Sequence, residues 1–245
     1  MTVREQFARR AIRMPPVTIL IDERFEGPPA IANGGYVAGV LAEVIPGPLR
    51  VRLHAPAPVG LPLQLDHDDH TVTLSENGTL LASGRAGDVL DEPPEFVGFE
   101  DAADALAARG ADVDHPFPKC FVCGPDREPS DGLRLLPAPV PGTEVAATPW
   151  VPHDALASSD GAISERFVWA ALDCPTYWSI AEPGELALLG TLAGRVLGAV
   201  RPGDRCVVVA RAVGRESRKL LSSSAVYNES GELIGAARAT WIKVG

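Results

Sequence analysis

The chain contains one eleven-residue pattern twice, as Glu76-Asn77-Gly78-Thr79-Leu80-Leu81-Ala82-Ser83-Gly84-Arg85-Ala86 and as Glu229-Ser230-Gly231-Glu232-Leu233-Ile234-Gly235-Ala236-Ala237-Arg238-Ala239. The offset between the two copies is constant, 229 − 76 = 153 residues. Each copy predicts a strand, a tight turn and a second strand, because Asn-Gly and Ser-Gly accept the positive φ that hairpin turns require. The sequence therefore predicts an internal repeat built on antiparallel hairpins.

The elements before each hairpin recur in the same order. Pro58-Val59-Gly60 and Arg201-Pro202-Gly203 each introduce an apolar run that is typical of a strand. These runs extend from Leu61 to Leu65 and from Cys206 to Ala210. The repeat thus covers more than the hairpin itself.

Each half also contains one apolar helix candidate ahead of its strands. The first is entered through Asn33-Gly34-Gly35 and stopped by Pro46-Gly47, and its apolar residues have helical spacing. The second, Phe167 to Leu172, has the same spacing and precedes Pro175, which is expected to end or kink the helix. Apolar helices of this kind are suited to being wrapped by a curved sheet. We expect an α+β fold in which curved antiparallel sheets each surround a central helix.

The length of 245 residues fits two compact units. A Pro-rich acidic stretch, Asp88 to Glu95, and a short helix candidate, Ala102 to Arg109 closed by Gly110, separate the halves. An apolar strand is expected over Gly132 to Leu136. We predict an N-terminal repeat over 1–98, a linker with a short helix over 99–117 and a C-terminal repeat over 118–245.

Composition narrows the partners and the compartment. The formal net charge of −10 would repel nucleic acid and anionic membranes. No apolar run reaches the roughly 20 residues of a membrane span, and Met1 to Pro16 lacks the apolar stretch of a secretory signal. The four cysteines do not form a disulfide-type pattern. We expect a cytoplasmic protein with reduced thiols and neither nucleic acid nor membrane as partner.

Several short segments resemble hotdog-fold thioesterases. Cys120 to Pro125, followed by Asp131 to Leu135, resembles the opening of hotdog domains of the phenylacetyl-CoA thioesterase type, and Gly214 to Trp241 is similar to their last strands. Leu172-Asp173-Cys174-Pro175 resembles the segment in which those enzymes have a catalytic aspartate. Asn33 to Leu41 resembles the Gly-Gly-Tyr helix start of double-hotdog acyl-CoA thioesterase-like proteins. The resemblance implies a tandem (double) hotdog and hydrolysis of acyl-CoA or another acyl thioester.

The sequence departs from that family at one motif. Relatives often place His-Gly-Gly ahead of the catalytic helix, whereas this chain has Asn33 in the first half and Asp160-Gly161 in the second. We expect Asp173 to lie in a largely apolar tunnel beside Trp169, Tyr177 and Trp178, which would set its pKa. Trp169 and Tyr177 are expected to contact the substrate.

Thioester hydrolysis requires an activated water or a carboxylate nucleophile, and donors for the developing oxyanion. Asp173 would supply the carboxylate, and the helix start at Asn33, Gly34, Gly35 and Tyr36 would bind the substrate and supply backbone amides across the pseudo-twofold axis. Alternatively, Asp173 only begins a new helical turn before Pro175, and Gly34-Gly35 only forms a tight turn.

Two further carboxylates are catalytic candidates. Glu165 lies near the start of the second helix, where the macrodipole alone favours an acidic residue. Glu43 lies late in the first helix, where some relatives have glutamate, but its spacing from Asn33 is ten residues and the resembling motif usually has nine.

Arg215, Arg218 and Lys219 form a compact basic cluster on a loop before the penultimate strand. This cluster is expected either to bind the phosphates of coenzyme A or to be a solvated loop. No cofactor is expected apart from the coenzyme A of the substrate.

The pair Cys120-x-x-Cys123 has the spacing of half a zinc site, and His115 precedes it. A second cysteine pair is missing, and Cys174 or His153 would complete the set only if the fold brought them near. The acidic and histidine-rich run Asp66 to His70 is explained more simply by a polar turn. We therefore expect no metal and a structural role for the cysteine loop.

Two other functions remain open. A hotdog dehydratase or hydratase normally uses a histidine, and all five histidines lie outside the two helix candidates. A non-catalytic acyl-thioester-binding protein fits the missing His-Gly-Gly. Serine hydrolase, nucleotidase and Rossmann patterns do not occur in the sequence. The expected partner is a small acyl thioester, and the expected state is a monomer, itself a pseudo-dimer, or a homo-oligomer.

Overall fold

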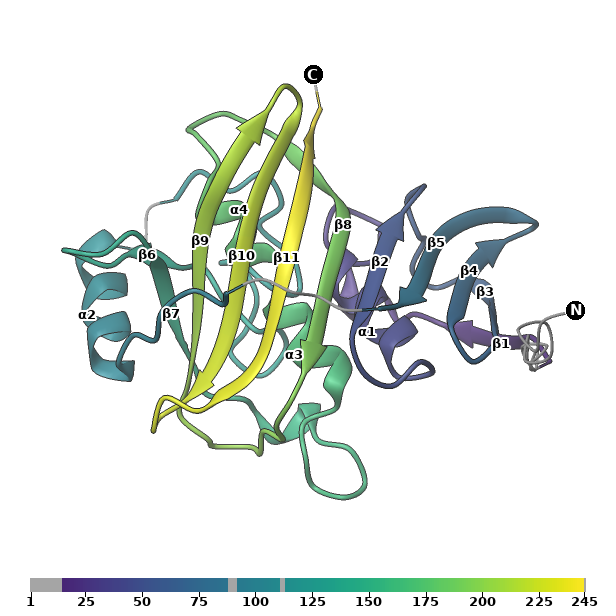
Figure 1. Cartoon of the computed structure of the whole chain (residues 1–245), viewed down its shortest axis with the longest axis horizontal. Helices are drawn as coiled ribbons and strands as arrows, with labels where there is room; N and C mark the ends of the chain where they lie inside the picture. The colour runs from purple at the N-terminus through teal and green to yellow at the C-terminus, as the bar shows by residue number, and fades with distance from the viewer. Residues whose placement is uncertain (1–14, 88–91, 111–112, 245) are drawn as a thin grey trace, which may run out of the picture.

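The computed structural model describes residues 15–87, 92–110 and 113–244. The N-terminal start and part of the Pro-rich stretch, residues 1–14 and 88–91, lie outside these ranges. Within them, strands join into one antiparallel sheet in the order β1-β3-β4-β5-β2-β8-β11-β10-β9-β7-β6 (Figure 1). The strands are β1 Val17–Leu20, β2 Leu49–Leu53, β3 Pro62–His67, β4 Thr71–Glu76, β5 Thr79–Ala86, β6 Ala138–Pro139, β7 Ala146–Trp150, β8 Ala187–Val196, β9 Cys206–Glu216, β10 Lys219–Asn228 and β11 Leu233–Lys243.

The two predicted hairpins are present. In the first, β4 and β5 are joined by Asn77 and Gly78, whose φ angles of 47° and 82° are the positive values that such a turn requires. In the second, β10 and β11 are joined through Gly231, with φ 81°. The internal repeat found in the sequence is therefore a repeat of structure.

Each repeat places its helix behind its strands (Figure 1). In the first repeat this is α1, Gly34–Ala42, which ends sooner than the Pro46-Gly47 signal. In the second, the chain forms α3, Glu165–Ala171, and then α4, Cys174–Trp178. The break precedes Pro175, which agrees with the predicted interruption. Two short 3-10 helices, Glu23–Phe25 and Asp154–Leu156, complete the approach to α1 and α3.

The two repeats share one sheet and one core. β2 pairs with β8 from Leu49 opposite Gly194 to Arg52 opposite Thr191, so the ladder passes from one repeat into the other without a gap. Behind it, α1 packs directly on α3, and a Cβ at Gly39 would lie 2.5 Å from the Cα of Arg166. This close approach brings the start of α1 to the end of α3.

The linker helix is longer than expected. It forms α2, Phe99–Arg109, and ends at Gly110 with φ 80°. Its buried Ala102 and Ala105 belong to a small apolar cluster with β6, β7 and β9, at the edge of the second repeat. The boundaries at 98 and 117 stay a prediction.

The predicted strand over Gly132–Leu136 is wrong. No strand forms there, because Arg134 has a left-handed φ of 55° that interrupts extended backbone. The amides of Leu133 and Leu135 instead donate to the carbonyls of Phe121 and Val122 at 2.8 and 2.7 Å. This segment thereby fastens the cysteine loop.

Among the described helices, none has the length and apolar character needed to cross a bilayer.

Candidate active site between the repeats

A largely apolar cavity of about 330 Å³ lies between the two repeats. This volume is within the range of small-molecule sites. Its walls come from the start of α1, the segment after β2, the cysteine loop and the α3–α4 break. The beginning of β8 and the end of β11 complete them. The lining includes Asn33, Gly34, Leu53, His54, His115, Phe117, Cys120, Cys123, Asp173, Cys174, Tyr177, Trp178, Leu189 and Trp241.

Asp173 lies at the break between α3 and α4. Its backbone, with φ −84° and ψ −84°, is not helical, and its side chain makes no capping hydrogen bond to α4. The side chain is 1 % exposed. A carboxyl group that only began a helical turn would cap it and face water. The α3–α4 break therefore places a buried carboxyl group in the wall of the cavity.

The helix of the other repeat holds one oxygen of this carboxyl group. Oδ2 accepts hydrogen bonds from the Gly35 amide at 2.9 Å and from Asn33 Nδ2 at 3.0 Å. Gly35 has to be glycine, since a Cβ there would lie 2.3 Å from the Asp173 Cβ. Asp173 Oδ1 is buried and has no hydrogen-bond partner among the described residues. Because buried polar atoms are almost always hydrogen-bonded, this oxygen is a position at which a water molecule or a ligand would bind.

Burial raises the pKa of Asp173 to about 7, and a nearby thiolate at Cys120 acts in the same direction. The hydrogen bonds from Gly35 and Asn33 oppose this shift because they favour the charged form. A carboxyl group with this pKa can both accept and return a proton near neutral pH.

The three predicted amides at the start of α1 differ in what they bind. The Tyr36 amide donates to Oδ1 of Asn33, the N-cap residue, at 2.9 Å, and the Gly35 amide donates to Asp173. The Gly34 amide has no partner among the described residues, and Gly34 lines the cavity. Of the three amides, that of Gly34 is open to a ligand.

The predicted aromatic residues do not all lie in the cavity. Tyr177 and Trp178 line it. Trp169 is 1 % exposed and packs in the core beside Gly194, and Tyr36 stacks on Phe25 with ring centroids 4.2 Å apart. Neither of these two side chains lines the cavity.

The other two carboxylates do not join Asp173. Glu165 is exposed at the first turn of α3, where burial of part of the group and the charge of Glu43 raise its pKa. Glu43 pairs with Arg166 and accepts from Ser164 Oγ at 2.6 Å. Neither lines the cavity.

The repeat explains the contact that Glu43 makes. Ser164 is the N-cap of α3 as Asn33 is the N-cap of α1, so the start of α3 facing Glu43 corresponds to the start of α1 facing Asp173. Two residues after its N-cap, α3 has Arg166, whereas α1 has Gly35 at the corresponding position. At the start of α3, the Arg166 side chain forms an ion pair with Glu43. At the start of α1, Gly35 has no side chain and leaves this space open.

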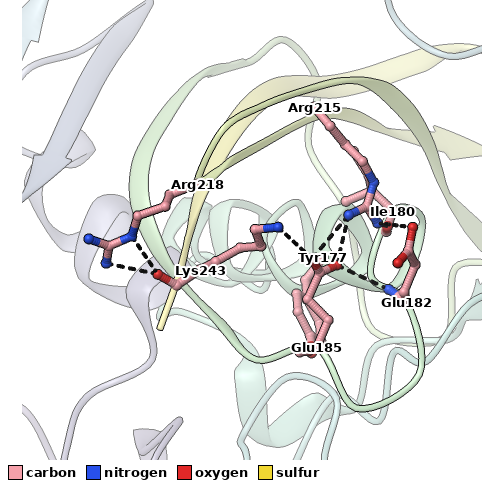
Figure 2. A network of polar contacts seen from close by, with 7 residues as sticks. All are labelled: Tyr177, Ile180, Glu182, Glu185, Arg215, Arg218 and Lys243. Carbon is pink, nitrogen blue, oxygen red and sulfur yellow. Dashed lines mark hydrogen bonds and ion pairs between the residues drawn. The ribbon is translucent and has the colours of Figure 1, made fainter. Parts of the chain in front are cut away.

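The basic cluster lies at the β9–β10 hairpin rather than on a separate loop (Figure 2). Arg215 pairs with Glu185 at 3.0 Å and with Glu182 at 3.4 Å, so its charge is already balanced. Arg218 donates to the main-chain carbonyl of Lys243 at 3.0 Å. Lys219 is exposed. Figure 2 shows Arg215 and Lys243 turned toward Glu185, whereas the guanidinium of Arg218 points away from it.

The fold brings Cys174 to the cysteine pair. The sulfur atoms of Cys120, Cys123 and Cys174 all lie within 4.8 Å of one another, and His115 Nε2 lies 3.2 Å from Cys123 Sγ. His153 is elsewhere, where it caps a 3-10 helix. No similar group of ligand atoms forms around Asp66 to His70 in the described ranges, where Asp68 accepts from the amides of the turn.

Sequence reasoning missed that two histidines, His54 and His115, line the cavity. Neither lies on a helix, and His54 is placed by the turn after β2, for which the sequence offers no spacing signal. For His115, its short separation from Cys120 was the available signal.

No family model matches this chain, and no curated protein sequence matches it. Solved structures do. A hotdog-fold protein of unknown function from Alicyclobacillus acidocaldarius has a TM-score of 0.61 at 13 % identity, over 94 % of this chain and 93 % of its own. The tesB protein of Mycobacterium avium subsp. paratuberculosis has a TM-score of 0.59 at 13 % identity, over 96 % of both chains.

A protein from Thermobifida fusca, provisionally assigned as a thioesterase II, has a TM-score of 0.61 at 14 % identity, over 96 % of both chains. These likenesses extend over nearly the whole chain and confirm the expected fold, a double hotdog. At such identities they establish the fold and not the reaction.

Proposed function

We propose that the protein hydrolyses acyl thioesters, with acyl-CoA as the substrate class, at the cavity between the repeats. The observation that supports this most is Asp173 Oδ1, a buried carboxyl oxygen at a largely apolar cavity that has no hydrogen-bond partner in the described part of the chain. An acyl chain suits the apolar walls, and a water molecule suits the unpaired oxygen. The description of the Thermobifida fusca neighbour as a thioesterase II agrees with this assignment.

The proposed reaction uses one residue from each repeat. Asp173 accepts a proton from water, and the water oxygen forms a bond to the thioester carbonyl carbon. The Gly34 amide donates to the oxyanion of the tetrahedral intermediate, aided by the positive end of α1. The C–S bond then breaks, and the proton returns from Asp173 to the leaving sulfur. The products are a carboxylic acid and a free thiol.

The nucleotide end of coenzyme A is assigned to the β9–β10 hairpin. Arg218 and Lys219 are exposed there and have no carboxylate partner among the described residues. Arg215 is a weaker choice because Glu185 and Glu182 already bind it. We assign phosphate binding to Arg218 and Lys219, with Arg215 holding the hairpin in place.

The experiment is a panel of acyl-CoAs, from short to long chains and with an aromatic acyl group. Released coenzyme A is measured by chromatography, so that the protein's own cysteines do not contribute, and binding is measured by calorimetry. Saturable release well above the uncatalysed rate is expected for at least one chain length. Tight binding without any release would instead identify a binding protein.

The same panel tests the hydratase alternative, which His54 in the cavity wall keeps open. A 2-enoyl-CoA is included, and its conjugated absorbance is followed together with coenzyme A release. Loss of conjugation with the thioester intact would overturn the proposed hydrolysis.

A further inference from the structure

The cavity wall contains a group of nucleophilic side chains that the proposed hydrolysis does not use. Cys120 and Cys123 lie on the loop after residue 117, and Cys174 is the first residue of α4. All three are buried, and all three line the cavity. Their sulfur atoms lie within 4.8 Å of one another.

The spacing of the sulfur atoms fits a metal ion. Cys120 Sγ and Cys174 Sγ are 3.8 Å apart. In a tetrahedral zinc site with Zn–S bonds of about 2.3 Å, two sulfur ligands are about 3.8 Å apart.

The cysteine loop is shaped to direct both of its thiols to one point. The Gly124 amide donates to the Cys120 carbonyl at 2.8 Å, and a Cβ at Gly124 would lie 2.5 Å from the carbonyl oxygens of Cys120 and Pro118. This tight turn holds the Cys120 and Cys123 sulfur atoms within 4.8 Å of each other and of Cys174 Sγ.

Two side-chain donors also face the sulfur atoms. Asn33 Nδ2 lies 3.6 Å from Cys174 Sγ and 3.9 Å from Cys120 Sγ. His115 Nε2 lies 3.2 Å from Cys123 Sγ, while its Nδ1 accepts from the Phe117 amide at 3.0 Å. Because Nδ1 is an acceptor, the neutral ring has its proton on Nε2 and donates to the sulfur. His115 therefore supports a ligand rather than acting as one.

We propose that Cys120, Cys123 and Cys174 bind one Zn²⁺ through their three sulfur atoms, with the fourth coordination position open toward the cavity. Three thiolate ligands suit Zn²⁺ better than Mg²⁺ or Ca²⁺, which require oxygen ligands. The proposal revises the expectation of a purely structural loop. The proposal is independent of the proposed hydrolysis, because it is tested by measuring bound metal and not by measuring turnover.

The first test is metal content. The full-length protein is purified under reducing conditions with Zn²⁺ present, dialysed and analysed by mass spectrometry of the metal. About one zinc per chain is expected for the wild type and for Cys206→Ser, which changes a buried cysteine outside the cavity. Cys120→Ser, Cys123→Ser and Cys174→Ser are expected to lose it. Zinc-free wild type, or zinc retained in all three variants, would overturn the proposal.

The second test uses Co²⁺ as a spectroscopic probe, so that the conclusion does not depend on how well each variant folds. Anaerobic titration of wild type is expected to give the near-ultraviolet sulfur-to-cobalt charge-transfer band and the visible bands of a tetrahedral ion, saturating at one equivalent. Added imidazole is expected to change the visible bands because the fourth position is open. Absence of the charge-transfer band overturns the site, and an imidazole-insensitive spectrum overturns the open position.

The thiol count separates the site from a redox pair. Under denaturing, non-reducing conditions all four cysteines are expected to react with a thiol reagent. A count of two, with a bond between Cys120 and Cys174, would replace the metal site by a disulfide. His115→Ala is expected to weaken Zn²⁺ binding by about 10- to 100-fold, as the loss of a supporting hydrogen bond does.

Discussion

Gly35 decides, at the scale of single residues, whether the two repeats can share a site. Its amide holds Asp173 Oδ2, and its missing side chain leaves room for the Asp173 Cβ. Gly34 has a different environment. A Cβ there would lie 2.8 Å from Leu189 Cδ2, 2.9 Å from Leu53 Cδ1 and 3.3 Å from Leu189 Cβ, and the two nearest of these atoms are the ends of flexible side chains.

We predict that Gly35→Ala lowers the free energy of unfolding by about 1–3 kcal/mol, the range for overpacking a core. Hydrolysis should fall with it, because Asp173 must move. Gly34→Ala is the matched control and should change stability by less than about 1 kcal/mol, since alanine favours the helix by about that amount. Chemical denaturation of both variants measures the difference. Equal stability of the two would contradict the close contact.

Glu43 contacts the start of α3 and is the pseudo-symmetric counterpart of Asp173 at the start of α1. It accepts from Ser164 and Arg166 and does not line the cavity. We predict that Glu43→Gln lowers the melting temperature while kcat stays near that of the wild type. A catalytic carboxylate would instead cost roughly 100-fold or more in kcat at unchanged stability. Kinetics and thermal unfolding of the same preparation separate the two.

At the scale of elements, the β9–β10 hairpin is the proposed docking point for the phosphates. We predict that Arg218→Ala combined with Lys219→Ala raises KM for an acyl-CoA about tenfold, the loss expected for one or two exposed charge contacts. KM for the same acyl group on a short thiol that lacks phosphates should not change. Arg50→Ala, an exposed arginine on β2, is the control. An equal rise with both substrates would contradict phosphate binding at this hairpin.

The elements also show which features the sequence could reveal. Turn chemistry is local, so Asn77-Gly78 and Gly231 predicted their hairpins, and Gly110 predicted the end of α2. The strand expected over Gly132–Leu136 failed because apolar composition does not report backbone conformation, which Arg134 sets. This irregular segment instead holds the cysteine loop through main-chain hydrogen bonds, a contact between two loops that leaves no periodic pattern in the sequence.

The site was predictable only in part, for a similar reason. The sequence marked Asp173 and the α1 start as partners across the repeats, and the structure joins them directly. It did not reveal that Glu165 would be exposed or that Trp169 and Tyr36 would face the core. The direction of a side chain on a helix depends on where the neighbouring helix crosses. Here Gly35 and Gly39 fix that crossing.

At the scale of the whole molecule, the two repeats form one structural unit. The β2–β8 ladder continues the sheet, and the core contains residues of both repeats. We predict one cooperative unfolding transition. All four tryptophans, Trp150, Trp169, Trp178 and Trp241, lie in the second repeat, so fluorescence reports that repeat, whereas far-ultraviolet circular dichroism reports the whole chain. The two denaturation curves should coincide. Separated midpoints would show that the repeats unfold independently.

The central claim is that the buried carboxyl group of Asp173 activates water for thioester hydrolysis. The most direct measurement is kcat/KM of Asp173→Asn on the best acyl-CoA of the panel, beside Asp104→Asn, which makes the same change on exposed α2. Asparagine keeps the shape and can still accept from the Gly35 amide. We predict a loss of about 10²- to 10⁴-fold for Asp173→Asn, the range for a general base, and an unchanged value for Asp104→Asn. A folded Asp173→Asn protein that releases coenzyme A at the wild-type rate would contradict the account.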